Sequence, residues 1–128
     1  MSKLFLVVGS VLGALSVVLG AFGAHTLKKV LPADSLATFE TGVRYQFYHT
    51  FALIAVGLLL QRAQLQWLNW AGYSFMIGIL LFSGSLYLLA FLNTPEMVGM
   101  RKIGIITPFG GLFFIAGWVC MLIGIIKQ

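Results

Sequence analysis

The residues best suited to chemistry gather in one stretch of an otherwise apolar sequence. Glu40, Arg44, Tyr45, Gln46 and His49 follow one another within about three turns of a predicted helix. Glu40 and Arg44 are helical neighbours in the order that favours an ion pair. Gln46 and His49 share a different face with Tyr45, nearly opposite Glu40, so this helix has two polar faces. A neutral imidazole inside a membrane needs both a hydrogen-bond donor and an acceptor as partners.

Catalytic chemistry is not indicated by these residue types. The sequence holds no HExxH, GxSxG, P-loop or GxGxxG pattern. His25, His49 and Glu40 do not have the spacing that is diagnostic of a metal site, and a serine near a histidine is too common in helix bundles to define a nucleophile. The single cysteine, Cys120, offers neither a disulfide nor a Cys-based metal site within the chain. We therefore expect no catalytic residue, no metal and no cofactor.

The elements that position these residues must lie in a bilayer. Of the 128 residues, 60% are hydrophobic and only 9% are charged, whereas soluble domains carry about 25% charged residues. The mean hydropathy is +1.02. Since one crossing takes roughly 20 apolar residues, the chain has room for four. We expect an all-α polytopic membrane protein, a single domain over residues 1–128 with four transmembrane helices in a bundle and short loops.

Polar residues divide the chain into four predicted spans, at about residues 4–24, 38–60, 67–92 and 107–126. An amphipathic segment at about residues 34–41 precedes the second span, with Asp34 as its N-cap. The fourth span begins either at Ile103 or, as we favour, at Pro108, because Thr107 as N-cap with Pro108 at the first helical position is a favourable start. Residues 103–106 would then form an apolar loop buried against protein. A signal peptide is the alternative for the N-terminus, but that first apolar run exceeds the usual 7 to 15 residues, so we expect no cleavage.

Basic residues flank the apolar blocks instead of forming a patch. The net charge of +5 therefore indicates membrane anchors and not a nucleic-acid partner. One side of the membrane is expected to hold Lys3, Arg62 and Lys127, and the other Lys28, Lys29, Arg101 and Lys102. Arg44 joins the second group where it reaches the interface. Because cytoplasmic loops carry the excess of basic residues, this count predicts that both termini lie outside the cytoplasm.

Small residues form stripes on the first and fourth predicted spans. The candidate helix-packing residues are Gly9, Gly13, Ser16, Gly20 and Gly23 on the first span, and Gly110, Gly117 and Gly124 on the fourth. Such stripes let two helix backbones approach closely. We favour packing within the bundle, while a homo-oligomer through the same faces stays open. Trp67, Trp70 and Trp118 are of the type found in an interfacial belt.

Alternating helix directions bring polar residues from all four spans to one end of the bundle. The candidate ligand-binding residues are His25, Arg44, Tyr45, Gln46, His49, Ser83, Ser85, Tyr87 and Thr107. One interpretation is a hydrogen-bond network that holds the helix ends in register. The other is a pocket for a lipid headgroup or a small anionic ligand, with positive charge from Arg44, Lys28 or Arg101.

These alternatives translate into function classes. The first is a membrane-embedded binding or scaffold protein that contacts membrane lipids or other membrane proteins. The second is a small transporter or channel-like protein. Proton coupling needs an acidic group within the membrane, and Glu40 lies near the end of its span. A pore needs polarity across the whole bilayer, which the half near Lys3, Arg62 and Lys127 lacks. We therefore favour the first class.

Four motifs in order resemble a known family. They are GAFGAH at residues 20–25, FETGVRYQ with YH at residues 39–49, FSGSLY at residues 82–87, and ITPFGG with Gly117-Trp118 at residues 106–118. They resemble small four-helix bacterial inner-membrane proteins of the YgdD/YwdK type, a domain of unknown function with a eukaryotic transmembrane counterpart. The resemblance covers essentially the whole chain and implies a multi-pass protein of the bacterial inner membrane. It implies no activity, substrate or cofactor, but its motif residues are those expected at the polar end, which favours a pocket there.

Overall fold

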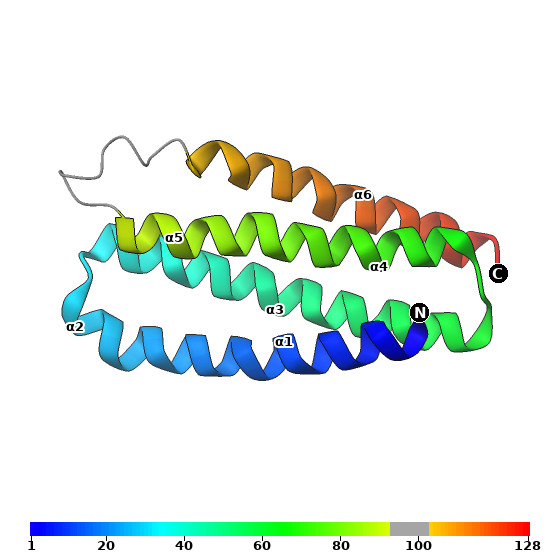
Figure 1. Cartoon of the computed structure of the whole chain (residues 1–128), viewed down its shortest axis with the longest axis horizontal. Coiled ribbons are helices and arrows are strands. Elements are labelled where there is room, and N and C mark those ends of the chain that lie inside the picture. The colour runs from blue at the N-terminus through cyan, green and yellow to red at the C-terminus, as the bar shows by residue number, and fades with distance from the viewer. Residues whose placement is uncertain (93–102) are drawn as a thin grey trace.

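The computed structural model describes residues 1–92 and 103–128, and every regular element in these ranges is a helix. Four helical stretches are long and apolar enough to cross a membrane: Ser2–Val30, Ala33–Arg62, Gln66–Leu92 and Ile103–Ile126. They run side by side in alternating directions, with both termini at the same end (Figure 1). The predicted all-α transmembrane bundle is therefore confirmed.

The first stretch is longer than the predicted span 4–24. It consists of α1 (Ser2–Phe22), a π-helical segment η1 (Gly23–Leu27) and α2 (Lys28–Val30). No residue before Pro32 breaks the helix, so it continues past His25. A residue that precedes proline is disfavoured in the helical region, and Leu31 is extended, with φ −90° and ψ 144°.

The second stretch is one helix, α3 (Ala33–Arg62), which includes both the predicted amphipathic segment and the predicted span. The prediction that Asp34 is the N-cap is wrong. Pro32 holds that position, and no side chain caps the helix. Asp34 instead lies in the first turn, where a carboxylate is still favoured by the positive end of the helix dipole.

The third stretch begins one residue before the predicted span 67–92 and ends at the predicted residue, and the fourth begins at Ile103, the earlier of its two predicted starts. The third joins α4 (Gln66–Gly78), a π-helical segment η2 (Ile79–Ser83) and α5 (Gly84–Leu92). In the fourth, α6 (Ile106–Ile126) follows a 3₁₀ turn at residues 103–105, so the predicted apolar loop is wrong. Thr107 is not its N-cap, since Ile105 holds that position. Pro108 is tolerated in the first turn because the amides there have no partner within the helix.

Helix α3 contacts each of the other helical stretches of the bundle. Helix α3 packs against α1 on one side and against α4, η2 and α5 on another, while α6 packs on α4 and η2. In Figure 1, α6 lies along the α4–α5 stretch, on the side away from α1. Phe5, Leu53, Leu68 and Phe75 are fully buried where these helices meet. This arrangement leaves a seam between α3 and α6.

Both small-residue stripes face a neighbouring helix of the same chain. A Cβ at Gly9 would lie 2.7 Å from Ile54 Cγ1, and one at Gly23 would lie 3.0 Å from Phe39 Cε1. Gly13, Ser16 and Gly20 continue this stripe on α1, with Ser16 buried and the two glycines near Thr50 and Val43. On α6, Gly110, Gly117 and Gly124 face Phe82, Phe75 and Leu68. The glycines thus allow α1 to approach α3, and α6 to approach α4 and η2.

Candidate functional site

Gln46 joins three helices through buried hydrogen bonds. Its side chain is only 4% exposed. The Tyr87 hydroxyl of α5 donates to Gln46 Oε1 at 2.6 Å, and Gln46 Nε2 donates to the backbone carbonyl of Leu12 in α1 at 3.1 Å. A buried amide in a membrane finds no water, so these protein partners satisfy it.

His49 is buried one turn further along α3. Trp118 Nε1 of α6 donates to His49 Nε2 at 3.1 Å, and His49 Nδ1 lies 2.7 Å from the backbone carbonyl of Tyr45. An indole N–H only donates, so Nε2 is the acceptor and Nδ1 carries the proton given to Tyr45. The ring also stacks on Phe114, with centroids 3.5 Å apart and planes at 6°. His49 is therefore a neutral imidazole with both nitrogens occupied.

Serine and threonine hydroxyls connect the remaining helices. Ser83 Oγ, which is fully buried, donates to the backbone carbonyl of Gly42 in α3 at 2.7 Å. Ser85 Oγ donates to the carbonyl of Phe82 at 2.9 Å and lies 2.6 Å from Thr107 Oγ1. Thr107 can give its own proton to Ser85, which joins α5 to α6. This use of the hydroxyl explains why Thr107 does not cap the helix.

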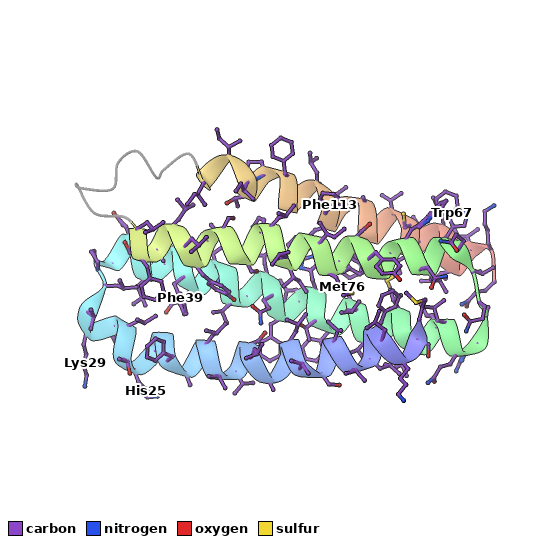
Figure 2. All side chains as sticks on the ribbon, viewed as in Figure 1. His25, Lys29, Phe39, Trp67, Met76 and Phe113 are labelled. Atoms are coloured by element: carbon purple, nitrogen blue, oxygen red, sulfur yellow. The ribbon has the colours of Figure 1, made fainter. Side chains whose placement is uncertain are left out.

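The sequence-predicted site residues divide into two groups. Gln46, His49, Ser83, Ser85, Tyr87 and Thr107 are bonded to other residues inside the bundle. His25, Arg44 and Tyr45 have exposed side chains, and Figure 2 shows His25 projecting away from the helices. Of the other cations considered, Lys28 is exposed and Arg101 lies outside the described residues.

The buried polar residues are not confined to one end of the bundle. Gln46 and His49 lie near the middle of the 30-residue helix α3, and Trp118 lies near the middle of α6. Sequence reasoning missed Trp118 as the partner of His49 because tryptophan is typical of the membrane interface. Its position midway along the predicted fourth span was the available signal. Trp67 does lie at the end that carries the termini (Figure 2).

Two hollows open along the seam between α3 and α6. We call the larger, of about 510 Å³, the histidine groove; its lining residues are Tyr45, Tyr48, His49, Phe82, Gly111, Phe114, Ile115 and Trp118. We call the second, of about 420 Å³, the arginine hollow; its lining residues are Ala55, Leu58, Leu59, Arg62, Met121 and Ile125. Both are lined mainly by hydrocarbon and aromatic side chains. Within the described ranges, no three His, Cys, Asp or Glu side chains lie close enough to hold a metal ion.

Four spanning helices joined by buried hydrogen bonds define a multi-pass integral membrane protein. The family described as "Protein of unknown function (DUF423)" matches residues 19–111, and this chain belongs to it. The UPF0382 membrane protein SH2409 of Staphylococcus haemolyticus is 41% identical over 125 residues, which cover 98% of this chain and 97% of that protein. The UPF0382 inner membrane protein YgdD of Escherichia coli K12 is 38% identical over 126 residues, or 98% and 92% of the two chains. The predicted resemblance is thereby confirmed. No solved structure matches this chain.

Proposed function

We propose that this protein binds membrane lipid, with an acyl chain held in the histidine groove. The observation that carries the proposal is the groove itself, which lies between two spanning helices and so faces the hydrocarbon of the bilayer. Its volume of about 510 Å³ is in the range of about 300 to 1,000 Å³ that is usual for ligand pockets. The proposed function is binding, without a catalytic step.

The chemistry of the lining supports an apolar occupant. His49 is the most polar ring in the groove, yet its two nitrogens already bind Trp118 and the Tyr45 carbonyl. Apart from the hydroxyls of Tyr45 and Tyr48, the surface left to a ligand consists of the faces and edges of aromatic rings and the side chain of Ile115. A polar ligand would lose its hydration there without gaining new hydrogen bonds from the histidine. A hydrocarbon chain has no hydrogen bonds to water that it would lose on entering the groove.

The arginine hollow supports a phospholipid in particular. Arg62 lies 13 residues after His49 on α3, which is about 20 Å along a helix. That distance is about half of the 40 to 45 Å that a bilayer spans with its headgroups. A chain that ends beside His49 therefore places its phosphate near Arg62, with Lys127, the C-cap of α6, two residues beyond the last lining residue of the hollow. No other described side chain forms an ion pair or hydrogen bond with Arg62, so its guanidinium is available.

A transporter or channel has less support from the buried polar residues. Although Thr50 Oγ1 and Asn69 Oδ1 are buried without a hydrogen-bond partner among the described residues, Gln46, Tyr87 and His49 form hydrogen bonds between helices. Side chains engaged in this way favour a fixed core. A scaffold for another membrane protein would use the same exposed seam and is separated from lipid binding by the experiment below.

Filling the groove is expected to weaken lipid binding. A Cβ at Gly111 would lie 3.9 Å from Phe82, so a side chain is accommodated there, and Gly111→Leu extends into the groove. We expect about a tenfold loss of affinity, or about 1.4 kcal/mol. The measurement uses Trp118 as the only tryptophan, with Trp67 and Trp70 replaced by phenylalanine. Its emission is followed in detergent while a phosphatidylglycerol with a dibrominated stearoyl chain is added, and wild type should show saturable quenching.

The matched control is Gly84→Leu, because a Cβ at Gly84 meets nothing within 4 Å and Gly84 does not line the groove. This variant should bind as the parent does. Arg62→Gln should weaken binding about threefold, since it removes an exposed phosphate partner. Unchanged quenching in Gly111→Leu would contradict the proposal. The proposal would also be contradicted if native mass spectra showed that Gly111→Leu abolishes binding of a second copy of the chain and leaves lipid binding unchanged.

We also propose that both termini lie outside the cytoplasm. Lys28 and Lys29 follow the first span and are exposed, and the excess of basic residues marks the cytoplasmic side. Alkaline phosphatase fused after Gln128 should therefore be active in cells, and green fluorescent protein at the same position should be dark. A fluorescent and phosphatase-negative pair of fusions would reverse the orientation.

A further inference from the structure

A third hollow lies on the other side of α3, between α1 and α3, and it holds two opposite charges. Its volume is about 270 Å³, and its lining residues are Gly20, Gly23, Phe39, Glu40, Val43 and Arg44. We propose that this paired-charge hollow binds a zwitterionic lipid headgroup that carries a phosphate and a primary ammonium. The inference goes beyond the proposed function, because the site, its chemistry and its helices differ from those of the histidine groove.

The charges of Glu40 and Arg44 do not neutralise each other. Glu40 and Arg44 are spaced as a helical ion pair, yet no ion pair joins them within the described part of the chain. Arg44 Nη2 instead donates to Thr41 Oγ1 at 3.3 Å. A guanidinium has five N–H donors, so most of them stay free. The Glu40 carboxylate is exposed and has no hydrogen bond from another described residue. Among the described residues, the hollow therefore presents one anion without a hydrogen-bond partner and one cation with a single hydrogen bond.

The floor of the hollow is apolar, because Gly20 and Gly23 let the first helical stretch pack closely on Phe39 and Val43 of α3. A Cβ at Gly23 would lie 3.0 Å from the Phe39 ring, and one at Gly20 would lie 3.6 Å from Val43 Cγ1. The ring of Phe39 is itself buried, with 2% exposure. An apolar floor below two charges suits the glycerol and first carbons of a lipid below its headgroup.

The depth of the charges agrees with a headgroup site. Helix α3 has 30 residues and is about 45 Å long, so a centred hydrocarbon core of about 30 Å leaves roughly 7 Å of helix on each side. Glu40 lies about 10 Å from the start of α3, just inside this boundary, and Arg44 is one turn deeper. Arginine side chains extend from such positions to the phosphate layer.

The charge pattern selects among headgroups. A phosphate suits the planar donors of Arg44, and a primary ammonium can donate hydrogen bonds to Glu40. A choline headgroup has no N–H to donate. A glycerol headgroup can donate hydroxyl hydrogen bonds to Glu40, but it carries no positive charge to offset the repulsion between Glu40 and its phosphate. Phosphoethanolamine is therefore the expected chemistry.

The test is native mass spectrometry of the Gly111→Leu protein with equimolar ethanolamine, choline and glycerol phospholipids of the same acyl chains. Because Gly111→Leu fills the histidine groove, lipid bound to this variant reports on the paired-charge hollow. The ratio of the bound headgroups can be measured whether or not the groove binds lipid in the wild-type protein. We expect about a tenfold preference for the ethanolamine lipid. Glu40→Gln should abolish the preference over the glycerol lipid. Arg44→Gln should reduce all three lipids about tenfold.

Matched controls are Asp34→Asn and Lys28→Gln, which remove one charge of each sign at exposed positions near the same end of the bundle. Both should keep the preference. A Glu40→Gln protein that still prefers ethanolamine would overturn the inference. Equal loss of the preference in Asp34→Asn would also overturn it, because the total charge of the surface would then explain the binding. Circular dichroism confirms that each variant is folded.

Discussion

Replacing Gly110 with alanine is expected to destabilise the protein by about 3 kcal/mol. The added Cβ would overlap the backbone nitrogen of Phe82 in η2 and lie 2.8 Å from its Cα. Backbone atoms of a packed helix cannot rotate away as the end of a side chain can, so α6 must move off η2. Overpacking of this kind costs about 1 to 3 kcal/mol, and a backbone clash belongs at the upper end. A loss of that size lowers the melting temperature by roughly 10 °C.

The readout is the thiol of Cys120, the single cysteine, which is partly buried in α6. A thiol-reactive dye in detergent should report its exposure on heating. The matched control is Gly84→Ala, since a Cβ there meets nothing and alanine favours a helix by about 1 kcal/mol over glycine. Its melting temperature should stay unchanged or rise. If the two variants had the same melting temperature, α6 would not approach η2 as closely as described.

Helical periodicity was sufficient to orient the polar residues of α3. Spacing alone separated Glu40 and Arg44 from Gln46 and His49, and the structure leaves the first pair exposed and buries the second, although Tyr45, which was predicted on the face of Gln46 and His49, is 39% exposed. This works because α3 is an uninterrupted helix in a medium where only helices satisfy the backbone. Hydrophobicity located the spans for the same reason.

The N-caps of α3 and α6 and the hydrogen-bond partners could not be predicted from the sequence. Capping preferences assigned Asp34 and Thr107 to helix ends, but Pro32 ends the preceding turn and the Thr107 hydroxyl lies 2.6 Å from that of Ser85. The π-helical segments η1 and η2 shift the residues that follow them off the regular period of 3.6. Which carbonyl or ring meets Gln46 or His49 depends on that shift and on how α1, α5 and α6 are rotated. No pattern within one helix contains this information.

The π-helical segment η2 also determines where the seam opens. Phe82 in η2 contacts Gly110 through its backbone and lines the histidine groove with its ring. Ser83, the next residue, points the other way and donates to Gly42 of α3. Two consecutive residues thus hold α6 and α3 to the same segment. The same contacts that fix the fold therefore shape the proposed lipid site.

Tyr87→Phe is expected to destabilise the protein by about 2 kcal/mol, although it removes one oxygen atom. The lost hydroxyl donates to Gln46 Oε1 at 2.6 Å, and that amide is 4% exposed. An unpaired buried acceptor costs about 1 to 3 kcal/mol. Gln46→Leu should cost a similar amount, because it leaves the Tyr87 hydroxyl without its acceptor. Thermal unfolding in detergent measures both.

The double variant distinguishes this bond from a simple loss of packing. With both polar groups removed, no partner is left unsatisfied, so the double variant should be destabilised by less than the sum of the single changes. The expected coupling is about 1 to 2 kcal/mol, toward the upper end of what membrane proteins show. Tyr48→Phe is the matched control, since Tyr48 is exposed on the same bundle, and its melting temperature should not change. Strictly additive losses would mean that the bond between Tyr87 and Gln46 does not hold α5 to α3, and that packing alone does.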